Sequence, residues 1–397
     1  MSFLNFKFEN LMKYKITYLF LFISFFYNSI SQIDSTKSNK NKHRLVLNSD
    51  SNVVFSGTRI VTKTDSNEFH KVEIGGYVST YYAHYSDEIE NNGFVQFPTM
   101  GARNDQFGLN IAQIGMQYQD QQFRGNITLH YGDIPESNWP KPFTLIQEAH
   151  AGFKIIKNLW LDAGFFKTHI GIESIQPREN ITSSMSIVNF YEPYFLSGAK
   201  LTYQVNSKLS VQINAFNGYN EYIENNKNKA LGFSAIYDVN QNISLTYNFL
   251  SCDETPDNIK TKHERFYHNL YGTFKFNKFT LGVEANHGSQ KNTLLLDTTK
   301  TATMYSGLIV AKYQVLKKYG IYGRGEYFSD KNRILTGKTN LGSYIYGVTG
   351  GIEFKPARNV SFSAEYRFLE SENLIFKTDG YMTNHRDEYI ICLDVWF

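Results

Sequence analysis

Alternation of apolar and polar side chains is the feature that most constrains this chain. From Lys71 to the C-terminus, alternation recurs in segments of about 10–15 residues, joined by connections that are alternately very short and long. In one segment the apolar residues Leu209, Val211, Ile213 and Ala215 interleave with Ser210, Gln212 and Asn214. Because a period of two places the two sets on opposite faces of a sheet, the chain is predicted to be all-β.

The polar face of these segments decides between a soluble sandwich and a membrane barrel. Soluble strands average about 5–6 residues, whereas these segments match the roughly 9–11 tilted residues with which a strand crosses a bilayer. Charged residues stand in mid-segment, among them Arg324, Glu326 and Arg367. A water-filled lumen accepts such charges, and a small packed core does not. Since backbone groups in hydrocarbon must be paired, the sheet is expected to close on itself.

Counting the segments predicts a transmembrane, antiparallel, up-and-down β-barrel of about sixteen strands. The strands are expected near residues 71–85, 105–119, 121–133, 144–157, 158–168, 193–206, 207–219, 228–239, 241–252, 264–276, 278–289, 301–314, 318–330, 343–355, 357–371 and 384–397. The count is good to two strands, because 264–276 alternates poorly and 71–85 adjoins a polar extension. Short turns are expected in the periplasm and long links outside.

Composition supports a barrel over a helical membrane protein. The chain has 32 Phe and 28 Tyr, which favour strands and the boundary between hydrocarbon and water. Mean hydropathy is −0.38, and only one long apolar run is present, at the N-terminus. The formal net charge of +3 gives no basic surface for nucleic acid. The two cysteines, Cys252 and Cys392, are expected to be free.

The N-terminal apolar run has the layout of a secretory signal. Residues 16–27 are apolar, follow Lys13 and Lys15, and precede small serines. We expect residues 1–31 to be removed, with a membrane anchor as the alternative and with Met1 or Met12 as the start.

The next segment, residues 32–70, is rich in Lys, Asn, Ser and Asp. It is expected to be a polar, loosely structured periplasmic leader in which Ile60 and Val61 pair briefly as a strand. Residues 71–397 then form the barrel.

The last segment ends the chain at Phe397. Its outward row is expected to be Tyr389, Ile391, Leu393, Val395 and Phe397. A terminal Phe behind alternating apolar residues resembles the signal read by outer-membrane assembly machinery, although a soluble edge strand is the alternative. Phe397 is expected at the periplasmic rim beside segment 71–85, with Glu388 and Asp394 facing water on the other side.

Several stretches resemble a known family. They are Asn104–Ala112, Gln147–Gly152, Leu159–Gly164, Thr168–Ser174, Pro193–Tyr203 and Asn217–Tyr219. Together they are similar to the OmpL-like β-barrel porins of Gram-negative bacteria, across about residues 70–250; the C-terminal third matches only in style. The resemblance implies an outer-membrane barrel and passive transport, and it implies no catalytic residues.

The longest link, 169–192, mixes isoleucines with charges, which suits a loop folded into the lumen; an ordinary surface loop is the alternative. Around the narrowest part we expect nine residues, three from this loop and six from the wall: Glu173, Arg178, Glu179, His150, Lys200, Arg324, Glu326, Glu365 and Arg367. The leading interpretation is a porin through which small hydrophilic solutes diffuse passively, with both charge signs at the constriction. The alternative is a plugged barrel that serves as an adhesin, receptor or envelope scaffold.

Patterns for catalysis or metal binding are missing from the sequence. It has no Gly-x-Ser-x-Gly elbow and no His-x-x-x-His or Cys-x-x-Cys spacing. We therefore expect no enzyme activity, no cofactor and no metal. The expected partners are outer-membrane lipid, the assembly machinery and small hydrophilic solutes, without nucleic acid; a homotrimer stays open.

Overall fold

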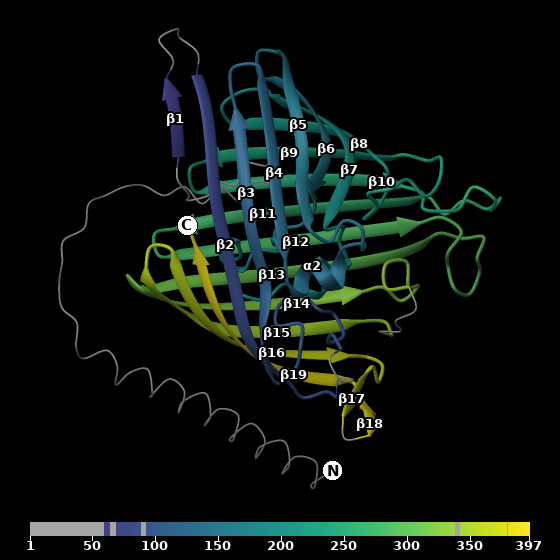
Figure 1. Ribbon diagram of the computed structural model, residues 1–397. Helices are drawn as coiled ribbons and strands as arrows, with labels where there is room; N and C mark the ends of the chain where they lie inside the picture. Colours follow the sequence, from purple (N-terminus) through teal and green to yellow (C-terminus); the bar gives the residue numbers. More distant parts are fainter. Residues whose placement is uncertain (1–58, 64–68, 89–92, 338–341, 379) are drawn as a thin grey trace, which may run out of the picture. The chain divides into compact units, whose positions relative to one another are not determined.

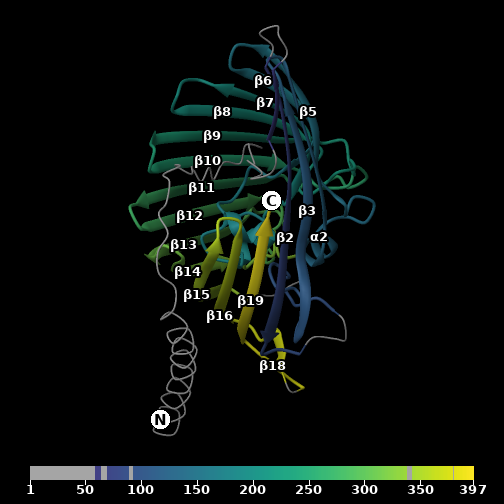
Figure 2. The ribbon, with the colours of Figure 1, turned by 60° about the vertical axis from the view of Figure 1, so that its left-hand side comes forward.

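The computed structural model describes residues 59–63, 69–88, 93–337, 342–378 and 380–397. Within these residues, an antiparallel sheet of sixteen strands closes into a barrel (Figures 1 and 2). The barrel strands are β2 (Phe69–Tyr85), β3 (Gln106–Gln119), β4 (Phe123–Tyr131), β5 (Ile146–Ile156), β6 (Leu159–Lys167), β7 (Phe195–Gln204), β8 (Leu209–Phe216), β9 (Ala230–Asn240), β10 (Ile243–Cys252), β11 (Arg265–Phe276), β12 (Phe279–Gln290), β13 (Ala302–Leu316), β14 (Tyr319–Ser329), β15 (Ile345–Ala357), β16 (Val360–Ser371) and β19 (His385–Trp396). The connections contain α2 (Asp133–Asn138), a 3-10 turn η1 (Pro177–Glu179), α3 (Ile187–Tyr191), and the short strands β17 (Phe376–Thr378) and β18 (Tyr381–Thr383). The signal peptide predicted at 1–31 and nearly all of the leader 32–70 lie outside the described residues.

The predicted strands are confirmed, since each of the sixteen segments overlaps one barrel strand. The poorly alternating segment 264–276 forms β11. Its pattern is irregular because Tyr267 and Tyr271 point inward into a buried apolar cluster, to which several other strands also contribute inward-facing apolar side chains. The predicted short turns are also present, although the one expected between segments 343–355 and 357–371 lies two residues later, at 358–359. Asn158 and Asn277 take positive φ values of 67° and 52° there, a conformation that Asn tolerates better than most residues.

The two faces of the sheet have opposite chemistry. Large apolar side chains are exposed on the outer face, as at Ile114, Ile127, Ile213, Leu270, Ile309 and Val348. Polar side chains are buried on the inner face, as at Asn126, Asn214, Asn248, Asn269 and Asn286. This is the reverse of a soluble sheet and suits a barrel surrounded by hydrocarbon. No helix among the described residues is long and apolar enough to span a membrane.

Closure of the barrel involves the last residue of the chain. β19 pairs with β2 along the seam, with Trp396 opposite Tyr77. Phe397 donates its N–H to the Gly76 carbonyl at 3.0 Å and accepts from the Gly76 N–H at 2.9 Å. The Phe397 ring lies over Gly76 so closely that a Cβ there would be 2.4 Å from it. Position 76 therefore accepts only glycine without a shift of the terminal ring.

Other sequence predictions are tested along the same strands. Tyr389, Ile391, Leu393, Val395 and Phe397 share the outer face, and their role as an assembly signal stays a prediction. Next to the seam, β1 (Arg59–Lys63) pairs with the beginning of β2, so Ile60 and Val61 do form strand contacts. Cys252 and Cys392 are buried and free, as predicted.

Candidate functional site in the barrel lumen

Residues 168–194, here called loop 3, connect β6 to β7 and cross the inside of the barrel. The short helix α3 begins after Ser186, whose hydroxyl accepts a hydrogen bond from the Asn189 N–H at 3.3 Å. Ile187 of this helix is buried in an apolar cluster with Phe328 of β14, and the Tyr191 ring stacks on Phe328 at 5.2 Å. Because β6 and β14 are eight places apart in a ring of sixteen strands, loop 3 reaches the wall opposite its origin.

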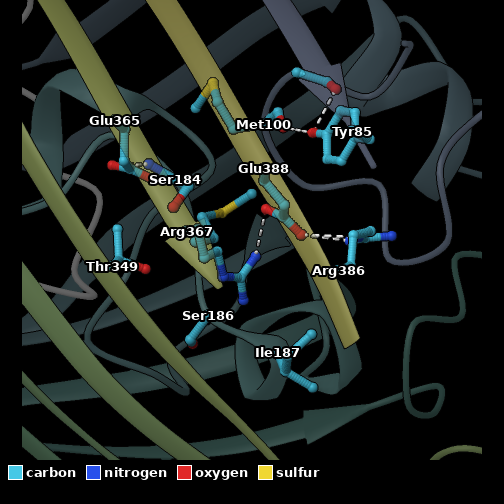
Figure 3. A network of polar contacts seen from close by, with 12 residues as sticks. Tyr85, Met100, Ser184, Ser186, Ile187, Thr349, Glu365, Arg367, Arg386 and Glu388 are labelled. Carbon is cyan, nitrogen blue, oxygen red and sulfur yellow. Dashed lines mark hydrogen bonds and ion pairs between the residues drawn. The ribbon is translucent and has the colours of Figure 1, made fainter. Parts of the chain in front are cut away.

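Charged side chains from β14, β16, β19 and two loops form one continuous series, which we call the ion-pair chain. Its members, in order, are Glu173 of loop 3, Arg324, Glu326, Arg367, Glu388, Arg386 and Asp87 of the link between β2 and β3. Neighbouring groups are 2.5–3.5 Å apart, nitrogen to oxygen. Figure 3 shows Glu388 between Arg367 and Arg386. Since the signs alternate, each charge lies beside an opposite one.

The same wall residues hold the backbone of loop 3. Glu326 accepts a hydrogen bond from the Ile187 N–H at 2.6 Å, and Glu365 accepts one from the Ser184 N–H at 3.2 Å. Arg324 donates to the Ser184 carbonyl at 2.6 Å. Hydrogen bonds to charged groups are roughly twice as strong as neutral ones. Loop 3 is therefore fixed to β14 and β16 through its main chain as well as through side chains.

The first half of loop 3 contacts the adjoining part of the wall, at β19, β2 and β3. Gln176 hydrogen-bonds to Gln113 of β3. The Arg178 guanidinium lies over the rings of Tyr77 and Trp396, 4.9 and 5.6 Å from their centres. Such cation–π contacts contribute about 2 kcal/mol when they are shielded from water. Loop 3 is thus bound to a continuous stretch of wall from β14 to β3.

A pair of carboxyl groups lies where loop 3 returns to the wall. The Glu192 carboxyl lies close enough to that of Glu284 on β12 for their charges to interact. Burial, together with the nearby charges of Glu284 and Glu173, raises the pKa of Glu192 well above its usual value. Glu192 therefore holds a proton more readily than a free glutamic acid does. Tyr267 donates to Glu192 at 3.1 Å, and Glu284 accepts from the Ile172 N–H at 2.7 Å.

The predicted constriction residues are much more buried than side chains that line a water-filled ring would be. The side chains of Arg324, Glu326 and Arg367 are 0%, 4% and 2% exposed, and Glu179 has the largest exposed fraction of the nine, 26%. A charge acts directly on a passing ion only where it reaches the water path. In this structure most of these groups instead connect loop 3 to the wall.

The surroundings predicted for two charges of the last strand are wrong. Glu388 and Asp394 do lie on the inner face of β19, but both are buried and neither looks into water. Asp394 accepts a hydrogen bond from the Tyr77 hydroxyl at 2.7 Å. The physical reason is that loops fill the lumen at this level and displace the water that an empty barrel would hold.

Two of the nine predicted residues lie on the wall opposite the ion-pair chain. His150 and Lys200 are on the inner face of β5 and β7, on either side of Phe166. The His150 ring is 4.7 Å from the Phe166 ring, and the Lys200 ammonium is 4.5 Å from its centre. The structure therefore divides the predicted set in three. Glu173, Arg324, Glu326, Glu365 and Arg367 gather at β14–β16, and His150 and Lys200 lie at β5–β8. Arg178 and Glu179 lie in the η1 turn, where Arg178 faces β2 and β19.

Sequence reasoning missed several members of the site. Arg386 and Glu388 are two positions apart on one strand, as Arg324 and Glu326 are. The alternation that predicts an inward direction for Arg324 and Glu326 therefore predicts it for Arg386 as well. Asp87 and Glu192 lie in loops, where no periodicity indicates direction. Among the residues that the structure describes, no group of three or more His, Cys, Asp or Glu is arranged to hold a metal ion.

Comparison with known proteins extends the sequence resemblance. A family model described as "Putative beta-barrel porin-2, OmpL-like" matches residues 71–397. No curated protein matches the sequence.

Several solved structures share the fold. The anion-selective porin from Comamonas acidovorans aligns with a TM-score of 0.57 and 10% identity, over 83% of this chain and 100% of that chain. The channel DcaP of Acinetobacter baumannii aligns with 0.58 and 10%, over 85% and 99%. The trimer form of OmpT, an outer membrane protein of Vibrio cholerae, aligns with 0.52 and 12%, over 83% and 99%. At these identities the matches establish the barrel fold alone.

Proposed function

Because this chain belongs to the OmpL-like family of β-barrel porins, and hence to the outer membrane of a Gram-negative bacterium, we propose that it lets small hydrophilic solutes diffuse passively across that membrane. The passage runs through the barrel, and loop 3 sets its narrowest part. Barrels of about sixteen strands are wide enough to leave an aqueous channel. On this proposal the protein catalyses no reaction and needs no cofactor.

The position of loop 3 is the observation that supports the proposal. The loop leaves β6, reaches β14 on the opposite wall, and is fixed there by Glu326 and Glu365 through its own backbone. A segment held across the lumen limits the size of any solute that passes it. The limit is then set by a firmly held loop rather than by the much wider ring of strands.

The charges play a different part from the one that the sequence suggests. We propose that Arg324, Glu326 and Arg367 anchor loop 3 and do not select ions, since their side chains are almost fully buried. Removing one member of a buried ion pair costs about 3–5 kcal/mol, because the other charge is left without compensation. The ion-pair chain thus keeps the constriction in one shape.

Two measurements test the porin proposal. Purified, refolded protein should carry ion current in a planar bilayer, and liposomes that contain it should swell in sugars, amino acids and oligopeptides up to a size limit. Correct folding is checked by heat-modifiable migration on a gel. If folded protein gives neither current nor swelling, passive diffusion through the resting barrel is refuted.

A plugged barrel that serves as an adhesin, receptor or envelope scaffold is the second candidate, and one observation favours it. Ile175 and Met185 of loop 3 are buried with Trp139 and Ile134 of the link between β4 and β5 in an apolar cluster inside the barrel. Such packing holds a plug well. Replacing residues 174–190 by a short Gly-Ser linker separates the two candidates. A porin conducts before the replacement and conducts more after it, whereas a plugged barrel conducts only after it.

Three further proposals concern biogenesis. Residues 1–31 are removed during export, the outward row from Tyr389 to Phe397 is read by the assembly machinery, and the barrels associate as a homotrimer. N-terminal sequencing of the mature protein, assembly of a chain that lacks Phe397, and chemical cross-linking in native membranes test them in turn. An unprocessed N-terminus, normal assembly without Phe397, or only monomers after cross-linking would each reject the corresponding proposal.

A further inference from the structure

The inner wall opposite the ion-pair chain carries five polar side chains, which we call the lysine patch. Its members are His150 of β5, Lys200 and Thr202 of β7, Asn214 of β8 and His169 at the start of loop 3. Lys200 and Asn214 are directly opposite each other in the pairing of β7 with β8. A Cβ at Gly232 of β9 would lie 2.9 Å from the Asn214 amide nitrogen and 3.2 Å from His169 Cε1. Asn214 and His169 therefore lie over the same glycine.

Most polar atoms of the lysine patch lack an internal partner. Within the described part of the chain, both ring nitrogens of His150, both amide atoms of Asn214, the Thr202 hydroxyl and His169 Nδ1 form no hydrogen bond. Asn214 and Lys200 are only 2% and 5% exposed. The Lys200 ammonium contacts the Phe166 ring but has no carboxylate within ion-pair distance among the described residues. Burying a polar group or a charge without a hydrogen-bond or ion-pair partner costs free energy, so the patch is suited to a bound polar species that supplies the partner.

The acidic residues nearby are already engaged. Asp162 accepts hydrogen bonds from Arg124, one of them at 2.7 Å, and Glu148 accepts from Asn126 at 2.6 Å and from the Lys167 N–H at 3.1 Å.

The charges of this region do not cancel. The charged groups that act on Glu148 and His150 are Arg124, Lys167 and Lys200 together with Glu148 and Asp162 themselves, which leaves one positive charge when the histidines are neutral. Burial keeps His169 neutral by lowering its pKa to about 4, and its Nε2–H donates to the Phe249 carbonyl at 3.2 Å. The local charge therefore matches a ligand with a single negative charge.

The apolar surroundings narrow the class of ligand further. The ring of His150 is 4.7 Å from that of Phe166, and the ring of His169 is 6.0 Å from that of Phe216. Aromatic surface beside one ammonium, one amide and one hydroxyl suits a carboxylate on a short aliphatic chain. Phosphate groups are more often held by arginines or by helix N-termini.

We propose that the lysine patch binds a short-chain monocarboxylate. Lys200 supplies the opposite charge, and the Asn214 amide and the Thr202 hydroxyl donate to the carboxylate oxygens. The inference rests on the proposed channel function, because the ligand reaches the patch through the lumen. The ion preference of the channel is then set on the β5–β8 wall.

Reversal potentials in a gradient of potassium acetate test the proposal. Lys200→Gln should lower the acetate-to-potassium permeability ratio about fivefold, the factor that attraction between unit charges about 4 Å apart gives in water. Asn214→Asp, which places a carboxylate beside Lys200, should lower it at least as much and guards against misfolding of the first variant. Lys208→Gln removes the same charge from an exposed turn and should leave the ratio unchanged. Equal ratios in wild type and in both patch variants would overturn the proposal.

A second readout does not depend on current. Saturation-transfer NMR of acetate with the folded wild-type barrel in detergent should show contact with the protein, and Lys200→Gln should abolish it. If the wild type carries no current but acetate contact is lost in the variant, the channel proposal fails and the binding site stands. If current flows and acetate contacts wild type and variant equally, the binding site fails and the channel stands.

Discussion

Substituting Arg324 by Met should release loop 3 from the wall. The Arg324 guanidinium bonds to Glu173 at 3.0 Å, to Thr182 at 2.9 Å and to the Ser184 carbonyl at 2.6 Å, and its side chain is fully buried. Met fills similar space but donates nothing. The substitution therefore leaves Glu173 as a buried carboxylate without its cation and removes the partner of a loop carbonyl.

The expected magnitude follows from this loss. Removing one partner of a buried ion pair costs about 3–5 kcal/mol. At about 1.4 kcal/mol per factor of ten, the lower value weakens docking of loop 3 roughly 150-fold. The barrel strands keep their ladders, so the cost falls on the loop and not on global unfolding.

Amide hydrogen exchange measures this directly. The N–H groups of Ser183 and Ser184 donate to Glu365, and that of Ile187 donates to Glu326, so each is protected only while loop 3 is docked. Their exchange should accelerate roughly 150-fold in Arg324→Met while strand amides stay unchanged. Arg358→Met, at an exposed turn, is the matched control. The double variant Arg324→Met/Glu173→Gln should recover part of the protection, because it also removes the unpaired charge. Wild-type exchange at all three amides in Arg324→Met would refute the anchoring argument.

Three other perturbations have defined outcomes. Glu192→Gln should weaken the pH dependence of amide protection in loop 3. Because its pKa is raised in the folded protein, Glu192 stabilises docking of the loop most below its unfolded pKa of about 4.3 and progressively less as the pH rises. Gln stays neutral at every pH. In the wild type, His169 has a pKa lowered to about 4, so its stabilisation of loop 3 docking is complete above about pH 6.5 and is lost as the pH falls towards 4. Protection of the loop 3 amides should therefore fall on acidification, and His169→Gln should remove this fall. Hydrogen exchange measured across that pH range checks the Glu192 and His169 predictions. In protein refolded in detergent, without the assembly machinery, Gly76→Ala should reduce the folded fraction seen as heat-modifiable migration on a gel, since its Cβ meets the Phe397 ring. The second substitution Phe397→Ala should restore that fraction.

The strands could be predicted from the sequence because membrane and lumen impose a strict period of two. Ile213 must meet hydrocarbon and Asn214 must not, and the same demand recurs along each barrel strand. Turns followed from the same pattern, since a strand of fixed length ends where alternation ends. The pattern weakens where loops replace water in the lumen, as at β11, where Tyr267 and Tyr271 face a buried apolar cluster, and at β13, where Leu308 and Val310 do.

The members of the site could be predicted in part, and their surroundings could not. The inward direction of Arg324, Glu326, Glu365 and Arg367 is a property of each strand alone. Their burial depends on which loop covers them, and Glu173 meets Arg324 across 151 positions of sequence. No local pattern records such a contact. Loop residues such as Asp87 have no periodic direction at all.

Charges at the contact between loop 3 and the wall also have a consequence that an apolar contact would lack. Well-packed apolar residues are often as stable as a buried ion pair, or more stable, so stability alone does not explain Arg324, Glu326 and Arg367. If loop 3 moves, a charged wall is simply hydrated by the lumen, whereas an apolar wall would be exposed to water at a cost that grows with its area. The ion-pair chain therefore holds loop 3 in one place while lowering the cost of its release. A permanent plug has no need of that property, whereas in the proposed channel it lets a firmly held loop return to its place after any displacement.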